Sequence, residues 1–250
     1  MHKALFKAII LAGGRGQRLL PLTNSIPKSM ITIGGRPILE HIINYLKNNN
    51  ITDCFISLCY LPQAVTSYFG DGKKFGVRIS YIYEDETQPM GTAGAIIKAQ
   101  KYINNTFIVT YGDILRELDV NKMIAYHQKK KALATIHTYK RDGKNPKSII
   151  KFNRSGRITS FEERPKRRVG EKERVWANGS FYIFEPEIFK FLLRKVPLDF
   201  SKDVFPRLIK TERIFAFSSN DFFIDIGTKE KLEKAQQLFP KFRMVNNGMP

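Results

Sequence analysis

AIILAGGRGQRLLPLTNSIPKSM, residues 8–30, is the segment of this 250-residue sequence from which the rest can be interpreted. A short, continuous apolar run stops at a group of glycines, which is typical of a buried strand in a parallel sheet. Glycines let the backbone approach an anion and point its N–H groups at it, and Arg15, Arg18 and Lys28 can neutralise that anion. The segment therefore predicts a phosphate-binding loop at the end of the first strand.

Two common phosphate loops do not fit this segment. A Walker loop needs Gly-Lys-Ser or Gly-Lys-Thr after a four-residue gap, and the sequence contains no such match. The dinucleotide fingerprint G-x-G-x-x-G lacks its third glycine, because Gly14-Arg15-Gly16 is followed by Gln17, Arg18 and Leu19. A nicotinamide-dependent oxidoreductase is therefore a disfavoured alternative.

Strand-like and helix-like segments alternate through the first half of the chain. The strand-like runs are residues 3–11, 52–60, 77–83, 105–113 and 132–140, and the helical patterns are residues 36–50, 91–103 and 119–131. Asp119 suits the N-cap of the last of these helices. We therefore expect an α/β fold with a Rossmann-like, mostly parallel sheet flanked by helices.

The second half has a different pattern. It contains a hairpin at residues 149–163, strands at 175–184 and 222–227, and helices at 185–195 and 228–239. This pattern predicts a small β-rich lid subdomain on the same sheet, and residues 241–250 are expected to form a C-terminal tail.

Composition narrows the class of partner. The formal net charge of +19 favours an anionic partner, but the sequence lacks the base-reading motifs of a nucleic-acid module, so a nucleic-acid binder is a weaker alternative. No apolar run reaches the ~18 residues of a membrane span, and no signal-peptide pattern opens the chain. Cys54 and Cys59 would point to opposite faces of one strand, so we expect reduced thiols and a cytoplasmic protein.

The pattern L-A-G-G-x-G-x-R-L-x-P-L-T, followed by P-K, resembles the signature of the sugar nucleotidyltransferases, the nucleoside-diphosphate-sugar pyrophosphorylases. Further segments resemble motifs of the same family in the same order: PMGTAGAI (89–96), FIVTYGD (107–113), FEERP (161–165), NGSFYIF (178–184), LDFSKDVFPRL (198–208) and FFIDIGT (222–228). Among subfamilies, the sequence is most similar to mannose-1-phosphate and manno-heptose-1-phosphate guanylyltransferases. The resemblance implies one domain over residues 1–240, with a nucleotide-binding half at about 1–143 and a sugar-binding half at about 144–240.

The resemblance also implies a reaction. A nucleoside monophosphate, best from GTP, would pass to mannose 1-phosphate or manno-heptose 1-phosphate, with Mg²⁺ as cofactor and pyrophosphate as the second product. A glucose-1-phosphate thymidylyl-, uridylyl- or cytidylyltransferase and a nucleotide-binding, non-catalytic homologue are the alternatives. The expected partners are these small molecules, without nucleic acid or membrane, and a homodimer is compatible with the pattern.

Site residues carry over from the motifs that match. Asp113 and Asp225 each lie near the carboxyl end of a predicted strand, where open α/β sheets bind ligands, and both match the metal-binding acids of the family. The implied catalytic residues are Arg18, Lys28 and Asp113. The implied nucleotide-binding residues are Leu11, Ala12, Gly13, Gly14, Arg15, Gly16, Gly91, Thr92 and Glu86, with Gln88 as an alternative to Glu86 at the base edge. The implied sugar-phosphate residues are Glu163, Arg164, Asn178 and Gly179.

The sequence departs from the family pattern mainly around the sugar phosphate. Arg164 stands where the family usually has lysine, and a planar guanidinium must hold the phosphate in a different pose. Ser148 stands where a glycine normally lets the sugar approach the backbone, and Gly179-Ser180 replaces Ala-Gly. Gln17 and Ser29 replace a threonine and a proline near the phosphate loop. We therefore expect retained nucleotidyl transfer with an altered sugar partner.

Overall fold

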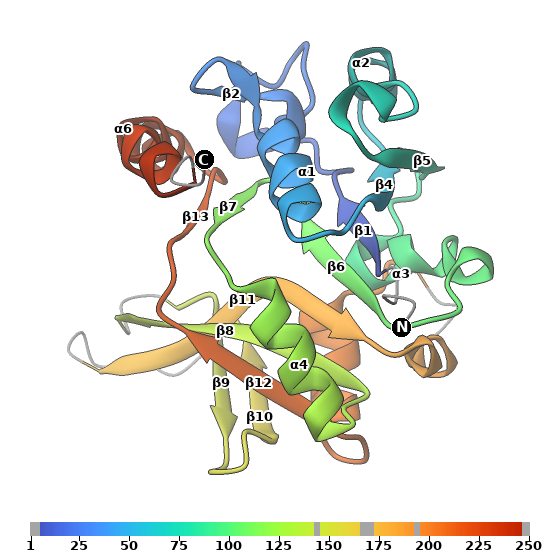
Figure 1. Cartoon of the computed structure of the whole chain (residues 1–250), viewed down its shortest axis with the longest axis vertical. Coiled ribbons are helices and arrows are strands. Elements are labelled where there is room, and N and C mark those ends of the chain that lie inside the picture. Colours follow the sequence, from blue (N-terminus) through green and yellow to red (C-terminus); the bar gives the residue numbers. More distant parts are fainter. Residues whose placement is uncertain (1–5, 143–145, 166–172, 193–195, 247–250) are drawn as a thin grey trace.

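The computed structural model describes residues 6–142, 146–165, 173–192 and 196–246, and within them a nine-stranded mixed sheet forms the centre of the molecule. β1 (Lys7–Leu11) lies between β4 (Asp53–Leu58) and β6 (Phe107–Tyr111), parallel to both, and β5 (Arg78–Tyr83) continues the sheet beyond β4. The predicted mostly parallel sheet flanked by helices is confirmed for this half of the molecule (Figure 1).

The second half extends the sheet in antiparallel fashion. β11 (Arg174–Phe184) pairs with β6 and with β8 (Ala134–Asp142), and β12 (Ile214–Ser219) lies parallel to β8. The predicted hairpin is present as β9 (Ser148–Phe152) and β10 (Ile158–Glu163), beyond β11. The expected boundary at residues 143 and 144 lies outside the described residues.

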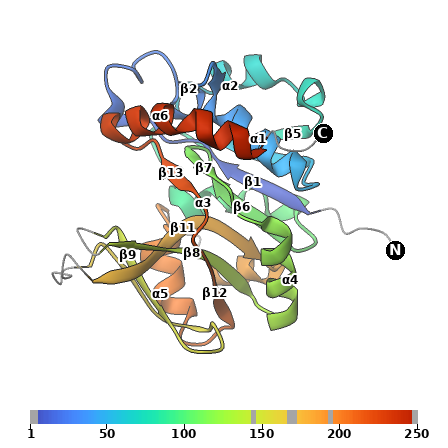
Figure 2. The same cartoon turned by 60° about the vertical axis from the view of Figure 1, so that its left-hand side comes forward.

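Helices cover both faces of the sheet. Apolar side chains of β1 alternate between the two faces, so each face needs helices to bury it. Ala8 and Ile10 belong to the core under α1 (Ile38–Asn48), whereas Ile9 belongs to the core on the other face with α3 (Gly91–Ile97). The remaining α-helices are α2 (Pro62–Phe69), α4 (Val120–Lys130), α5 (Phe205–Leu208) and α6 (Lys229–Asn246). In Figures 1 and 2, α1, α2 and α6 gather around the first half of the sheet, and α4 and α5 around the second.

Shorter elements join these layers. A two-stranded ribbon of β7 (Ile114–Arg116) and β13 (Phe223–Asp225) runs antiparallel, and β2 (Thr32–Ile33) pairs with β3 (Arg36–Pro37). Short 3₁₀ helices span Gln17–Leu19, Lys28–Met30, Lys73–Phe75, Gln100–Tyr102 and Pro186–Phe191, and one π-helical turn spans Phe200–Val204. No helix of the described residues is both long and apolar enough to cross a bilayer.

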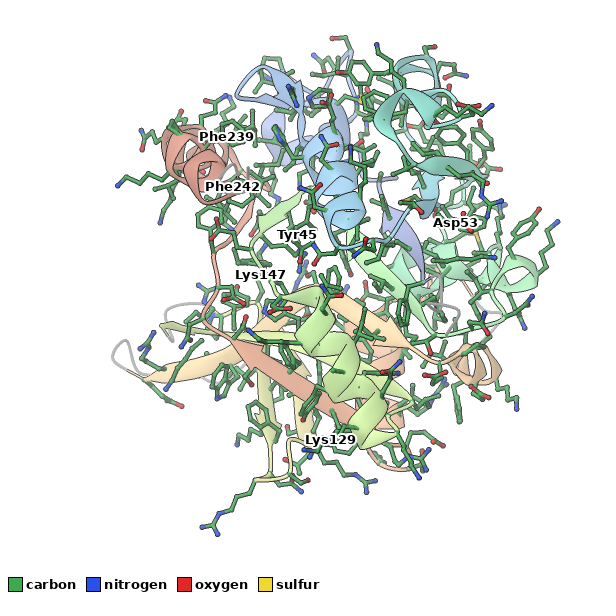
Figure 3. The ribbon with its side chains drawn as sticks, viewed as in Figure 1. Tyr45, Asp53, Lys129, Lys147, Phe239 and Phe242 are labelled. Carbon is green, nitrogen blue, oxygen red and sulfur yellow. The ribbon has the colours of Figure 1, made fainter. Side chains whose placement is uncertain are left out.

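The C-terminal helix is longer than the sequence predicts. α6 continues through Pro240 to Asn246, so residues 241–246, expected to be a tail, are helical. Aromatic packing explains the difference: Phe239 lies 4.8 Å from the His41 ring and Phe242 lies 5.3 Å from the Phe222 ring, measured between ring centroids (Figure 3). The sequence also predicts a short helix at residues 185–195, of which the structure describes residues 185–192, and there it has a 3₁₀ helix from Pro186 to Phe191.

Candidate active site

The glycine loop after β1 is folded tightly against its neighbours. Gly16 has a φ of +70°, and a Cβ atom there would lie 3.0 Å from the Thr23 methyl group, so only glycine fits without strain. A Cβ atom at Gly13 would likewise lie 3.0 Å from the Cβ of Cys59. The amide of Ala12 donates to the carbonyl oxygen of Ser57 at 2.9 Å, which fixes the start of the loop on β4.

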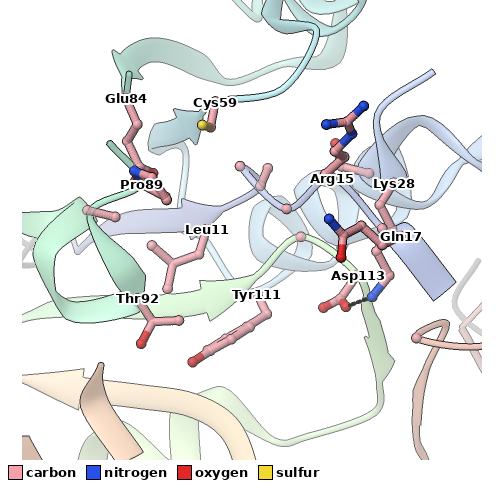
Figure 4. A pocket seen from close by; sticks show the side chains of 18 of the residues that line it. Leu11, Arg15, Gln17, Lys28, Cys59, Glu84, Pro89, Thr92, Tyr111 and Asp113 are labelled. Carbon is pink, nitrogen blue, oxygen red and sulfur yellow. Dashed lines mark hydrogen bonds and ion pairs between the residues drawn. The ribbon is translucent and has the colours of Figure 1, made fainter. Parts of the chain in front are cut away.

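This loop forms one wall of a cleft of about 580 Å³, a volume suited to a nucleotide-sized ligand (Figure 4). The following predicted nucleotide-binding residues line it: Leu11, Ala12, Gly13, Gly14, Arg15, Gly16, Gly91 and Thr92. Glu86 does not line it. That carboxylate points instead at Arg15, with 3.8 Å between Oε1 and Nη1, and both side chains are more than half exposed.

Glu84 is the acidic residue that lines the cleft in place of Glu86, and sequence reasoning missed it. Its Oε1 accepts a hydrogen bond from the Ser57 hydroxyl at 2.6 Å, and its Oε2 accepts one from the Met90 amide at 3.3 Å. Glu84 directly follows β5, and that position at a carboxyl strand end was the signal in the sequence.

Gly91 and Thr92 connect the cleft to the second half of the chain. Gly91 has a φ of +77°, and a Cβ atom there would lie 2.6 Å from the Leu198 carbonyl oxygen. A side chain at this position would collide with Leu198, so the close contact with the second half of the chain requires glycine here, and its expected role beside the base stays a prediction. The Thr92 hydroxyl donates to Asp199 at 2.9 Å and accepts from the Phe200 amide at 3.0 Å.

The two predicted metal-binding acids lie side by side, although 112 positions separate them in the sequence (225 − 113). Asp113 follows β6, Asp225 ends β13, and the Ile226 amide donates to the Asp113 carbonyl oxygen at 3.1 Å. Lys28 forms an ion pair with Asp113 (Figure 4). The fold thus brings the loop lysine and Asp113 into the wall of the cleft, with Asp225 beside Asp113.

Asp225 is surrounded by lysines that sequence reasoning did not identify. Its Oδ2 pairs with the Nζ of Lys231, and the Nζ of Lys147 lies 3.5 Å from the same atom. Burial alone would raise the pKa of Asp225, but the charges of Lys147 and Lys231 outweigh it, so that pKa lies below its usual value. Burial lowers the pKa of Lys147. Lys147 lies between the two halves of the molecule (Figure 3).

The oxygen ligands at Asp113 and Asp225 determine whether a divalent metal fits this site. The described residues contain no group of three or more His, Cys, Asp or Glu side chains placed to hold an ion. Mg²⁺ commonly uses only one or two carboxylates and completes its octahedron with water and substrate phosphates. Asp113 in the wall of the nucleotide-sized cleft and Asp225 beside it therefore fit Mg²⁺, provided that phosphate oxygens supply further ligands.

A second cavity of about 260 Å³ adjoins the first, and Arg18, Lys28 and Asp113 line both. Four further predicted residues line the second cavity but not the first: Glu163, Arg164, Asn178 and Asp225. Burial raises the pKa of Glu163. Ser148 is part of the wall, but its hydroxyl accepts a hydrogen bond from the Asn178 amide at 2.9 Å, so it is held against β11.

Gly179 does not line this cavity, contrary to the sequence prediction. Its Cα faces the opposite side of β11, where a Cβ atom would lie 2.8 Å from Cγ of the buried His137 ring and closer still to Nδ1. Its neighbours Asn178 and Ser180 face the cavity instead. Ser180 has a φ of +53°, a left-handed conformation that a serine rarely adopts.

Comparisons with known proteins agree with this geometry. The profile of the family described as nucleotidyl transferase matches residues 7–241. A UTP–glucose-1-phosphate uridylyltransferase of Synechocystis is 32% identical over 234 residues, covering 88% of this chain and 60% of the relative. A mannose-1-phosphate guanyltransferase of Saccharomyces cerevisiae is 30% identical over 227 residues, covering 88% of this chain and 61% of the relative.

Solved structures agree as well. HddC from Yersinia pseudotuberculosis, complexed with GMP-PN, superposes with a TM-score of 0.79 at 28% identity, covering 94% of this chain and all of that one. The chain spans about three fifths of the length of the curated relatives named above. With a family profile matched over nearly its whole length and the same fold in a solved relative, the chain belongs to the nucleotidyl transferase family.

Proposed function

We propose that this chain transfers a nucleotidyl group from a nucleoside triphosphate to a sugar 1-phosphate and releases pyrophosphate. The observation that carries the proposal is the pair of adjoining cavities that share Arg18, Lys28 and Asp113. One cavity has the volume for a nucleotide, and the other is lined by polar groups suited to a sugar phosphate. The shared residues would then contact both ligands.

The chemistry follows from this arrangement. An oxygen of the sugar phosphate attacks the α-phosphorus of the triphosphate, a new P–O bond forms, and the bond to the β-phosphate breaks to release pyrophosphate. Because two anions must approach each other, positioning and neutralisation of charge account for most of the catalysis. Arg18 and Lys28 carry positive charge at the meeting point, and Lys28 must exchange Asp113 for phosphate. When bound by Asp113 and Asp225, Mg²⁺ would supply further positive charge to the phosphate oxygens.

We propose GTP and mannose 1-phosphate or manno-heptose 1-phosphate as the substrates to test first. The relative from Saccharomyces cerevisiae, named a mannose-1-phosphate guanyltransferase, and the HddC complex with GMP-PN support this choice. UTP with glucose 1-phosphate is the second candidate, because the relative from Synechocystis is named a UTP–glucose-1-phosphate uridylyltransferase.

The experiment is pyrophosphate release from GTP, UTP, dTTP, CTP and ATP, each combined with a panel of sugar 1-phosphates and Mg²⁺. Release that requires both substrates would support the proposal and identify the base and the sugar together. Tight nucleotide binding without release for any pair would contradict it and favour a non-catalytic homologue.

A further inference from the structure

We propose that Arg116 is a positioning residue that sets the shape of the second cavity, by fixing a bulge of β11 against the β7–β13 ribbon, which begins directly after Asp113 and contains Asp225. The proposal rests on the proposed function only for the identity of the ligand in that cavity. The residue belongs to β7, three positions after Asp113, and no motif of the sequence drew attention to it.

Arg116 joins two parts of the site that are far apart in the sequence. Its guanidinium donates to the carbonyl oxygen of Gly179 at 2.9 Å and to that of Ser180 at 3.2 Å. On the ribbon it pairs with Phe223, two residues before Asp225, and its guanidinium lies 5.7 Å from the centre of the Phe223 ring. One side chain therefore links the β7–β13 ribbon to the strand that supplies Asn178 and Ser180 to the cavity.

The β11 segment that Arg116 holds is irregular and strained. The pairing of β11 with β8 shifts register between Asn178 and Tyr182, and Ser180 lies there in the left-handed region with a φ of +53°. The Ser180 amide donates to the Asn178 side-chain oxygen at 2.9 Å, and the Asn178 side chain donates to the Tyr182 hydroxyl at 2.8 Å. A non-glycine residue persists in this conformation only where its surroundings hold it, and the fork of Arg116 supplies part of that restraint.

The side chain of Arg116 is buried, so its contacts must compensate for the cost of burying a charge. The residue is 3% exposed, and no carboxylate forms an ion pair with it among the residues that the structure describes. Burial lowers the pKa of Arg116 to about 10, which leaves the guanidinium charged at neutral pH. A buried charge is costly unless it makes hydrogen bonds. The Arg116 guanidinium donates to two backbone carbonyls and lies over the rings of Phe181 and Phe223.

The first test replaces the planar guanidinium by an ammonium group in Arg116→Lys, with Arg174→Lys, an exposed arginine of β11, as the control. With the substrate pair selected by the pyrophosphate panel, we expect Arg116→Lys to raise the sugar-phosphate KM about tenfold or more and to lower kcat. The dissociation constant of the nucleotide should stay within about twofold, and the control should stay near wild type. Equal weakening of both ligands, or no change in a folded variant, would overturn the proposal.

A rescue variant separates positioning from general stability. Because glycine adopts the left-handed conformation freely, Ser180→Gly should reduce the dependence on Arg116. In the Arg116→Lys background we expect Ser180→Gly to recover about threefold or more of the lost kcat/KM. A double variant as impaired as Arg116→Lys alone would show that Arg116 serves only the stability of the core, and would overturn the proposal.

Hydrogen exchange of the wild-type protein covers the case in which Arg116→Lys does not fold. Mannose 1-phosphate and glucose 1-phosphate serve as probes, each measured without nucleotide. We expect at least one to slow exchange in the peptides covering residues 114–118 and 178–182 together. Slowing in only one of the two peptides, or in neither, would overturn the proposal. Absence of pyrophosphate release for every pair, with coupled slowing still present, would instead reject the proposed function and leave the role of Arg116 intact.

Discussion

The amide of Ile226 donates to the carbonyl oxygen of Asp113 at 3.1 Å, and this hydrogen bond places the end of β13 beside the end of β6. In register, Asp225 pairs with Ile114, the residue after Asp113, so the two carboxylates leave neighbouring backbone positions. A backbone connection of this kind is insensitive to side-chain replacement. The carboxylates can therefore be changed individually without separating the two strands.

Asparagine at either position should remove the negative charge and keep the side-chain shape. We expect Asp113→Asn and Asp225→Asn each to lower kcat about a hundredfold or more, because each removes a charge from the proposed metal and phosphate site. Steady-state pyrophosphate release measures the effect, and the exposed Asp221→Asn is the control. Activity within about threefold of wild type in either site variant would contradict the assigned roles.

Lys231 should compete with a divalent cation for Asp225. Its Nζ pairs with Asp225 Oδ2, and its side chain is 37% exposed, so solvent weakens the pair to roughly 1 kcal/mol. Loss of that competitor should tighten the binding of Mn²⁺, used as a probe in the absence of nucleotide, by about fivefold in Lys231→Met. Electron paramagnetic resonance of free Mn²⁺ gives the dissociation constant directly.

Lys234→Met provides the matched control for this experiment, because Lys234 is exposed on the same helix, α6. Its effect on the Mn²⁺ dissociation constant should be small, since only the general surface charge changes. If both lysine variants tighten Mn²⁺ equally, the pair with Asp225 has no specific role in metal binding.

Local patterns explain the parts of the fold that the sequence predicts. The first strand, its glycine loop and α4 each follow from residues close in sequence, and Asp119 caps α4 as expected, accepting a hydrogen bond from the Lys122 amide at 2.9 Å. Such features depend on hydrogen bonds and periodicity within a few residues. For the same reason the strand ends that carry Asp113 and Asp225 could be located.

Long-range packing determines what the sequence could not predict. β12 pairs with β8, which lies about 80 residues earlier in the chain, and no local pattern predicts that pairing. Glu84 and Glu86 are equally polar, and only the fold shows which one turns toward the cleft and which toward Arg15. The sequence predicts that Gly179 borders the sugar, whereas its missing side chain makes room for the ring of His137 on the opposite face.

This contact with His137 makes the effect of Gly179→Ala predictable. The added methyl group would lie 2.8 Å from His137 Cγ in a fully buried environment, and neither backbone can move without disturbing β8 or β11. Overpacking of this kind lowers the free energy of unfolding by about 1–3 kcal/mol. Urea denaturation followed by the fluorescence of Trp176, the only tryptophan of the chain, measures it.

A second replacement, at His137, tests whether the clash with its ring causes this loss of stability. Removal of the ring in the double variant Gly179→Ala/His137→Ala leaves space for the methyl group, so Gly179→Ala should cost less in the His137→Ala background than in wild type. An undiminished cost would place the clash elsewhere.

His137 should also make the stability of the protein depend on pH. Burial, and next the charge of Arg116, lower the pKa of His137 to about 3, against 6.5 for an ordinary histidine. Between these values the unfolded chain binds a proton that the folded protein does not, so stability falls as pH drops below about 6.5. From pH 7 to pH 5 this loss of stability amounts to about 2 kcal/mol.

The variant His137→Gln tests this prediction. Glutamine does not titrate and keeps an amide near Ser219, whose hydroxyl lies 2.9 Å from His137 Nε2. Wild type should therefore lose about 2 kcal/mol more than His137→Gln over this range in urea denaturation, because the other titrating groups are common to both proteins. Parallel losses in the two proteins would mean that the folded state accepts the proton on His137, and that burial beside Arg116 does not keep the ring neutral.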